Sequence, residues 1–183
     1  MSKKIICLYG GPCSGKSGIA HELCGLLKKS AFQAEINEEK VKDWIWENRP
    51  INQGDQHYIF AKHCKKERDL VRNSIDYIIN DCPLLITHYY GLKFDEFERD
   101  YNTSRHGLKQ HHEFVKSKGY KCDHFFLDRP DHYSEIGRFQ TKQESEKIDL
   151  EILELLREFN INYQRFQTQK DTASKIYGCI TKN

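Results

Sequence analysis

The stretch Gly10-Gly11-Pro12-Cys13-Ser14-Gly15-Lys16-Ser17 decides how the rest of the sequence is interpreted. It fits the pattern GxxxxGK[ST], in which glycines let the backbone curl so that its N–H groups point at phosphate oxygens. The apolar run from Ile5 to Tyr9 precedes it, and apolar residues at helical spacing follow it from Lys16 to Lys28. A buried strand, a glycine-rich turn and a helix are the context that the pattern requires, so we expect a phosphate-binding loop.

Each part of this loop has an expected role. The backbone N–H groups of residues 10–17 would hold the phosphates of ATP, and the Lys16 ammonium can reach the β- and γ-phosphates. The Ser17 hydroxyl can hold Mg²⁺. The alternative is a glycine-rich turn followed by an accidental Lys-Ser pair. The sequence has no guanine-specific Asn-Lys-x-Asp pattern, which favours ATP over GTP.

The composition limits the class of protein further. A chain of 183 residues has the length of one domain, with room for one hydrophobic core. The formal net charge of +2 argues against a general DNA coat and against a polybasic membrane anchor. No apolar run approaches the roughly 18 residues of a membrane-spanning helix. The seven cysteines have no CxxC spacing, which argues against a zinc site or a disulfide framework. We therefore expect a cytoplasmic protein without membrane contact or an obligate protein partner.

Strand and helix patterns alternate along the chain. Further strands are expected at 31–36, 75–80, 124–127 and 161–166, and further helices at 38–47, 54–72, 148–159 and from about 171. Residues 84–120 are expected to be mostly helical or irregular. This alternation predicts right-handed βαβ units, which build a parallel sheet with helices on both faces. Ligands bind such sheets at the carboxyl ends of the strands, so polar residues just after the strands are the candidate site residues.

Two carboxylates follow predicted strands. Asp81 ends the apolar run 75–80, where it could hold Mg²⁺ or orient an acceptor hydroxyl; the alternative is a helix cap or a turn. Glu39, at the start of the helix predicted at 38–47, could accept the proton of that hydroxyl. Acidic residues are also ordinary in a first helical turn, so both interpretations of Glu39 stay open.

Basic residues follow the fourth predicted strand. Arg129 and Arg138 border a polar segment, about 129–141, that suits a mobile lid closing on the γ-phosphate. The alternative is a pair of solvated loop arginines. Residues 101–124 contain five basic and two acidic side chains, with aromatic residues and four histidines between them. This segment, which includes His106, His111 and His112, could bind an anionic substrate or a nucleic acid strand. The favoured interpretation is a solvated helix face.

Beyond the loop, several pieces of sequence resemble small P-loop kinases. The specific similarity is to the compact P-loop proteins of phage genomes that are identified as AAA-family ATPases and are related to ribosylnicotinamide-kinase-like domains. The pieces are the GGPCSGKS loop, Glu39-Lys40-Val41-Lys42-Asp43, Gln56-His57-Tyr58-Ile59-Phe60, Asp81-Cys82-Pro83-Leu84-Leu85 and Gly137-Arg138-Phe139-Gln140, followed by a helix with Asp149. The resemblance covers nearly the whole chain. Cys82 departs from the family pattern, which usually has Ser there.

This resemblance implies a nucleoside/nucleotide-kinase-like α/β fold, with a parallel five-stranded sheet in the strand order 2-3-1-4-5. It implies that Lys16 and Ser17 are the Walker A residues, that Asp81 is the carboxylate after the third strand, and that Arg138 is the lid arginine. One domain, 1–183, would carry an acceptor region at about 84–121. A phage-encoded protein of this kind would work in the host cytoplasm.

Three functions follow from these observations. The first is an ATP- and Mg²⁺-dependent kinase that transfers the γ-phosphoryl group to a hydroxyl of a nucleoside, nucleotide or modified nucleotide. The second is a kinase of 5-hydroxymethyl pyrimidine bases within DNA, with residues 101–124 as the nucleic acid groove. The third is a nucleotide-binding module that hydrolyses ATP slowly. The catalytic residues of the first would be Lys16, Arg129 and Arg138, with Glu39 or Asp81 as the base.

Overall fold

The computed structural model describes residues 3–38, 44, 47, 49–50, 52, 54–130 and 141–182. The strands are β1 (Lys4–Tyr9), β2 (Ala34–Asn37), β3 (Tyr77–Asn80), β4 (Lys121–Asp128) and β5 (Gln164–Gln167). They form one sheet in the order β2-β3-β1-β4-β5, and every neighbouring pair is parallel. The predicted fold class and strand order are confirmed.

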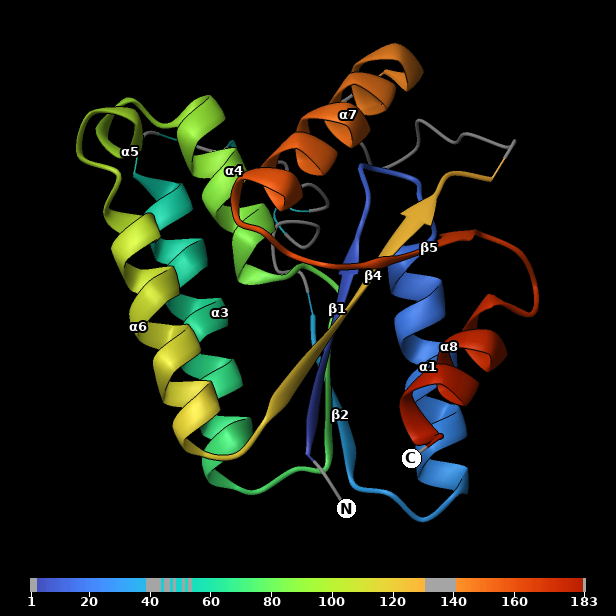
Figure 1. Ribbon diagram of the computed structural model, residues 1–183. Helices are drawn as coiled ribbons and strands as arrows, with labels where there is room; N and C mark the ends of the chain where they lie inside the picture. Colours follow the sequence, from blue (N-terminus) through green and yellow to red (C-terminus); the bar gives the residue numbers. More distant parts are fainter. Residues whose placement is uncertain are drawn as a thin grey trace.

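Helices cover both faces of this sheet. They are α1 (Lys16–Lys29), α3 (Asp55–Arg72), α4 (Leu84–Phe94), α5 (Glu96–Tyr101), α6 (Thr103–Ser117), α7 (Lys142–Glu158) and α8 (Thr172–Thr181). In Figure 1, α1 and α8 lie together on the right of the sheet, and α3, α4 and α6 lie on the left. Most of the helix predicted at 38–47 falls outside the described residues. No described helix has the length and hydropathy to cross a bilayer.

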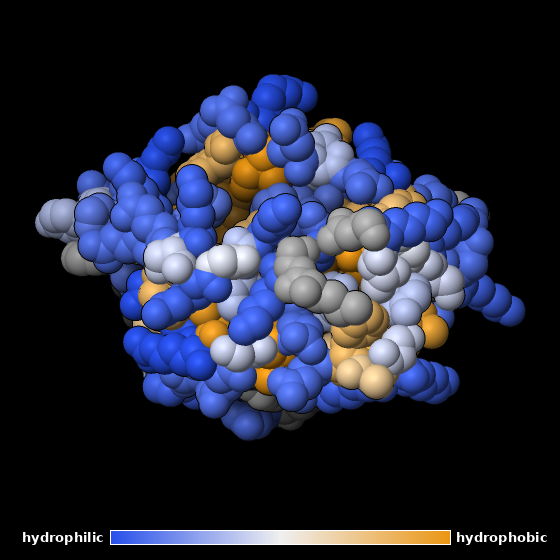
Figure 2. Space-filling model, turned by 60° about the horizontal axis from the view of Figure 1, so that its bottom comes forward, coloured by the Kyte–Doolittle hydropathy of each residue, from blue (hydrophilic) through white to orange (hydrophobic). Residues whose placement is uncertain are grey.

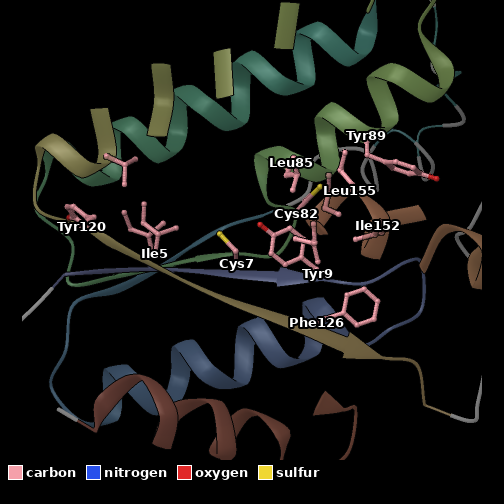
Figure 3. Close-up of a cluster of buried hydrophobic side chains, with 14 of the residues drawn as sticks. Ile5, Cys7, Tyr9, Cys82, Leu85, Tyr89, Tyr120, Phe126, Ile152 and Leu155 are labelled. Atoms are coloured by element: carbon pink, nitrogen blue, oxygen red, sulfur yellow. The ribbon is translucent and has the colours of Figure 1, made fainter. Parts of the chain in front are cut away.

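The central strand β1 is buried along its whole length. Because side chains alternate across a strand, Ile6 and Leu8 pack with the residues of α1 and α8, and Ile5, Cys7 and Tyr9 pack on the opposite face. Figure 3 shows the second group pointing from β1 toward the helical layer that contains Leu85 and Tyr89 of α4. The two hydrophobic clusters hold the sheet between two layers of helices.

Three strands begin two or three residues later than the sequence predicts. The reason is the same each time: a helix or helix-like turn ends in a residue with positive φ, and the next N–H bonds back to a carbonyl five residues earlier. The residues with positive φ are Ala31, Ser74 and Asn160, and the bonds run from Phe32 to Leu27, from Ile75 to Leu70 and from Ile161 to Leu156. This is the Schellman geometry, in which the apolar residue after the cap packs against the helix. The apolar residues Phe32, Ile75 and Ile161 therefore belong to helix ends, although they match the strand pattern.

The expected solvated helix face at 101–124 is wrong for His111. This residue of α6 is 4% exposed, and its Nε2 lies 2.5 Å from Glu67 Oε1 on α3. Its Nδ1 lies 3.1 Å from the Cys64 sulfur. Burial lowers the pKa of His111, but the hydrogen bonds to Cys64 and Glu67 and the charge of Glu67 outweigh it and raise the pKa to about 9. Because α6 is amphipathic, its histidines divide between the α3 interface and the surface.

Replacing Ile152 tests the packing of α7. Ile152 is fully buried among the residues that face α4, so Ile152→Ala removes apolar contacts and leaves a cavity. We expect the free energy of unfolding in urea to fall by about 2–5 kcal/mol. Leu150→Ala is the matched control because Leu150 is 63% exposed on the same helix. That control should change the free energy by at most about 0.5 kcal/mol, and equal effects at both positions would contradict the packing described here.

The His111–Glu67 pair predicts a dependence of stability on pH. Because the folded-state pKa of about 9 lies above the value of about 6.5 in an unfolded chain, His111 stabilises fully below pH 6.5 and loses its contribution as pH rises through 9. The loss is on the order of 3 kcal/mol. Urea unfolding of His111→Gln should show lower stability at pH 6.5 and a smaller decline toward pH 9. His106→Gln, an exposed change on the same helix, should keep the wild-type decline. Parallel profiles for wild type and His111→Gln would rule out this role.

Candidate functional site

The glycine-rich loop between β1 and α1 depends on two glycines at its ends. Gly10 has a φ of 137°, and a Cβ there would lie 2.6 Å from Ser14 Oγ and 2.7 Å from the Leu127 carbonyl oxygen of β4. Gly15 has a φ of 87° and caps α1. A Cβ on Gly15 would lie 2.6 Å from Thr168 Cγ2. Residues with a Cβ rarely adopt these φ values, and a Cβ would also collide with the neighbouring atoms, so both positions require glycine.

Lys16 lies across this loop. Its ammonium donates hydrogen bonds to the carbonyl oxygens of Gly10 at 2.6 Å and Gly11 at 2.9 Å, and to Ser14 Oγ at 3.3 Å. The charge of Lys16 is therefore held on the concave side of the loop, close to its backbone amides. The sequence placed Lys16 in a phosphate-binding role, and this geometry brings its cation to the loop that would hold the phosphates.

The start of α1 presents unpaired helical N–H groups beside this lysine. The cap residue Gly15 makes no side-chain hydrogen bond, and the first turn contains no acidic residue. Backbone N–H groups at a helix start favour an anion, and the helix dipole adds to that preference. Ser17 lies half-buried in this first turn. The loop and the helix start thus have the backbone geometry that favours an anion, with the Ser17 hydroxyl nearby.

Asp149 of α7 also bonds to the loop, a role that the sequence analysis did not assign. Its Oδ1 accepts the N–H of Gly11 at 2.5 Å, and its Oδ2 lies 2.8 Å from the guanidinium of Arg129. A Cβ on Gly11 would lie 2.7 Å from Asp149 Oδ1, so α7 packs directly on the loop. Burial raises the pKa of Asp149, and the Gly11 N–H and Arg129 act against this by favouring its charged form.

Arg129 lies against the loop and is not a solvated arginine. Its side chain is 8% exposed, and its Nε donates to the Pro12 carbonyl oxygen at 3.2 Å. Asp149 and Pro12 together fix the guanidinium at the loop, next to the end of β4. Arg138 and Glu39, the other two candidate side chains from the sequence, lie outside the described residues.

Thr168, just after β5, holds the other side of the loop. Its hydroxyl donates to the Ser14 carbonyl oxygen at 2.7 Å, and its N–H donates to the Asp128 carbonyl oxygen at 3.1 Å. A lone threonine after an edge strand carries no recognisable sequence pattern, which is why the sequence analysis missed it. The Asp149 carboxylate appeared there only as part of a family resemblance. The loop is thus braced by α7 on one side and by the β5–α8 connection on the other.

Asp81 lies at the carboxyl end of β3 with its carboxylate buried. It is 3% exposed, and its Oδ1 has no hydrogen-bond partner among the described residues. The N-cap residue of α4 is Pro83 and not Asp81, so Asp81 is not the cap of this helix. A buried carboxylate oxygen without a donor is costly unless a cation or a ligand hydroxyl meets it. Asp81 and the Ser17 hydroxyl are oxygen ligands of the type that Mg²⁺ prefers, so these two residues fit a magnesium site.

Two further buried polar groups lie near Asp81, and the sequence analysis missed both. Asn37 ends β2 and donates from its Nδ2 to the His63 carbonyl oxygen at 3.3 Å, and its Oδ1 has no partner among the described residues. His63 of α3 has its Nδ1 3.2 Å from the Cys82 carbonyl oxygen, and its Nε2 also lacks a described partner. Burial lowers the pKa of His63, which favours the neutral ring. The carboxyl ends of β2 and β3 therefore offer three unsatisfied polar atoms to a ligand.

Comparison with known proteins agrees with this geometry. A protein-family model described as an AAA domain matches residues 5–172. No curated protein matches the sequence. The crystal structure of NadR protein in complex with NR has a TM-score of 0.63 and 11% identity over 97% of this chain, which spans about half (50%) of the NadR chain.

Two kinase structures match along their whole length. The Mycobacterium tuberculosis APS kinase CysC, in complex with AMPPNP and APS, has a TM-score of 0.51 and 13% identity over 99% of both chains. The deoxyadenosine kinase from M. mycoides, with products bound, has a TM-score of 0.51 and 15% identity over 96% of both chains. At these identities the likeness concerns the fold, and the fold is that of P-loop nucleoside and nucleotide kinases.

Substituting Gly10 tests the steric account of the loop. Because its φ of 137° and its contacts with Ser14 and the Leu127 carbonyl leave no room for a Cβ, Gly10→Ala should lower the free energy of unfolding by about 1–3 kcal/mol. Gly18→Ala is the control, since Gly18 lies inside α1 with open space where its Cβ would be. That change should raise the stability by about 0.5–1 kcal/mol. A Gly10→Ala protein as stable as Gly18→Ala in urea would contradict the close approach of β4 to the loop.

Proposed function

The chain belongs to the AAA domain family, and we propose that it is an ATP-dependent kinase whose acceptor is a hydroxyl of a nucleoside, nucleotide or modified nucleotide. The observation that carries the proposal is the pairing of two features at one edge of the sheet. Lys16 lies over a glycine-rich loop, and Asp81 buries an unpartnered carboxylate oxygen at the end of the neighbouring strand. Phosphoryl transfer needs a cation at the phosphates and a carboxylate that can meet a metal or a hydroxyl, and these two residues supply such groups.

On the donor side, backbone N–H groups of the loop and of the start of α1 hold the phosphates of ATP, apart from Pro12, which has no N–H, and Gly11, whose N–H bonds to Asp149. The Lys16 ammonium exchanges its loop carbonyls for phosphate oxygens. Arg129 supports the same charge from the other side of the loop, where Asp149 and Pro12 fix its guanidinium. Preorganised cations stabilise the charge of the transferring phosphoryl group without reorganising at the moment of reaction. The lid predicted at about 129–141, which carries Arg138, lies outside the described residues from 131 to 140, so its action on the γ-phosphate stays a prediction.

Magnesium, held by Ser17 and Asp81, would neutralise charge on the β- and γ-phosphates when bound. The phosphoryl group leaves the bridging oxygen of ADP and bonds to the acceptor oxygen, which gives up its proton. Asp81 or Glu39 takes that proton as the general base. If Asp81 carries the metal, Glu39 is the base.

The acceptor is proposed to bind beside the carboxyl ends of β2 and β3. Asn37 Oδ1, His63 Nε2 and Asp81 Oδ1 are buried there without described partners, so a ligand with several hydroxyl or N–H groups would satisfy them. Ribose and nucleobases carry such groups. The proposal that residues 84–121 supply the rest of this acceptor region rests on their position after β3.

An acceptor screen with γ-labelled ATP and Mg²⁺ tests this function. Free nucleosides, nucleotides and duplex DNA with 5-hydroxymethyl pyrimidines are the three sets of acceptors. We expect label on a free nucleoside or nucleotide, and we expect Lys16→Ala to lower the rate about 10²–10³-fold. Lys29→Ala, an exposed change at the other end of α1, is the control and should keep the wild-type rate.

The other outcomes separate the competing functions. Label on modified DNA alone, lost on charge reversal of the exposed residues Lys116 and Lys118, would replace the free acceptor by a DNA base. Tight ATP binding with no labelled acceptor would indicate a slow ATPase module. Turnover that Lys16→Ala leaves unchanged would refute the assignment of the loop.

A further inference from the structure

A second concavity lies on the face of the sheet that α6 covers. It has a volume of about 690 Å³, and its lining includes Ile5 and Cys7 of β1, Cys122 and His124 of β4, and residues of α6 and of the α7–β5 connection. None of its lining residues belongs to the loop 10–17, and Asp81 is not among them. Figure 2 shows such a hollow, with hydrophobic residues at its bottom and hydrophilic residues around it. Sites for small molecules have volumes in this range and mostly apolar walls.

Asn80 supplies a built polar group in this cavity. It is 2% exposed and lines the cavity at the point where β3 pairs with Cys7 of β1. Its Nδ2 donates to Glu67 Oε2 at 2.5 Å, which identifies the other amide atom as the oxygen. That oxygen, Oδ1, has no hydrogen-bond partner among the described residues. A buried acceptor without a donor is costly, and a ligand N–H group would remove the cost.

His124 adds a neutral planar wall. Its ring stacks on the Tyr9 ring with centroids 5.7 Å apart and an angle of 28° between the planes. Its Nδ1 lies 3.1 Å from the Tyr9 hydroxyl oxygen. Burial lowers the pKa of His124 to about 4, so the ring is uncharged at neutral pH. Uncharged aromatic walls favour stacking with a planar ligand.

The mouth of the cavity is basic. The α6 side chains Arg105, His106, Lys109 and His112 line it at helical spacing. Within the described part of the chain, Glu67 is the one acidic residue of the lining, and it is paired with His111 and Asn80. Arg105 is paired with Glu158 at 2.8 Å, whereas Lys109 has no ion pair among the described residues. An anionic group of a ligand would therefore find its counter-charge at Lys109.

We propose that this cavity is a second ligand site, which binds a planar aromatic heterocycle carrying a ring N–H and an anionic substituent. The ring N–H donates to Asn80 Oδ1, the ring lies among the apolar walls beside His124, and the anion lies at the α6 side near Lys109. The site shares no lining residue with the loop that would bind ATP. Many of its lining residues belong to the segment 84–121 that the proposed function assigns to the acceptor region, so the inference rests on that function and names a ligand class for the segment, while its test needs no turnover.

Titration calorimetry with three probes of similar size tests the ligand chemistry. Indole-3-acetate has both the ring N–H and the anion, 1-naphthylacetate lacks the N–H, and tryptamine carries a cation in place of the anion. We expect indole-3-acetate to bind at one site, about tenfold or more tighter than either comparison probe. Saturating ATP and Mg²⁺ should leave its affinity unchanged, because the cavity shares no lining residue with residues 10–17.

Two pairs of variants locate the binding. Lys109→Glu reverses the unpaired charge and should weaken indole-3-acetate about tenfold, whereas Lys116→Glu, an equal charge change on an exposed part of α6 outside the lining, should not. Leu108→Trp fills the cavity and should abolish binding; Leu150→Trp, on the exposed face of α7, should not. Circular dichroism confirms that each variant is folded.

Three results would overturn the proposal. They are no binding of indole-3-acetate at millimolar concentration, displacement of the probe by ATP, and equal affinities for Lys109→Glu and Lys116→Glu. Loss of kinase activity in the acceptor screen would not affect this test, since the calorimetric readout needs no turnover. If Leu108→Trp does not fold, the Lys109 and Lys116 pair still decides the outcome because both positions are exposed.

Discussion

The pairing of β1 with β3 on one side and with β4 on the other is the constraint on which the site depends. Cys7 lies opposite Asn80, and Tyr9 lies opposite Phe126, so the three strands end at one edge of the sheet. Parallel strands in this register bring together the residues that follow them in the chain: the glycine loop, Asp81 and Arg129. At Gly10, the Leu127 carbonyl of β4 leaves no room for a side chain. A shift in the register of β1 and β4 would move Arg129 away from the loop.

The charged side chains that touch the loop, Lys16, Arg129 and Asp149, each have a defined partner. Lys16 bonds to loop carbonyls, and Asp149 connects Arg129 to the Gly11 amide. Because Asp149 already orders the Arg129 side chain, less side-chain conformational entropy is lost when the guanidinium binds an anion. The cavity on the α6 face differs, because the one carboxylate in its described lining, Glu67, is paired with His111, and exposed basic side chains of α6 line the cavity. The two sites therefore offer different chemistry on one sheet.

Much of the fold could be predicted because it depends on local patterns. The apolar run of β1, the loop and the amphipathic helices are each continuous in sequence, and their alternation predicted a parallel sheet. The order of the strands in that sheet came from the family resemblance. The starts of β2, β3 and β5 could not be predicted in the same way. Phe32, Ile75 and Ile161 have the hydrophobicity of strand residues, and only the positive φ of the residue before each one assigns it to the end of a helix. An apolar pattern indicates that residues are buried, but it does not show whether they belong to a strand or to the end of a helix.

For the site, the sequence by itself determined the loop, Lys16, Ser17 and the placement of Asp81 after a buried strand, because these residues are adjacent to strong local patterns. Only the structure shows the unpartnered polar atoms of Asn37 and His63, the hydrogen bond of Thr168 to the loop, and the pairing of Asp149 with Arg129 and Gly11. It also decided that His111 is buried against Glu67 while its neighbours on α6 are exposed. Each of these contacts joins residues far apart in the chain. A polar residue's partner depends on how helices pack across the sheet, and no short stretch of sequence records that packing.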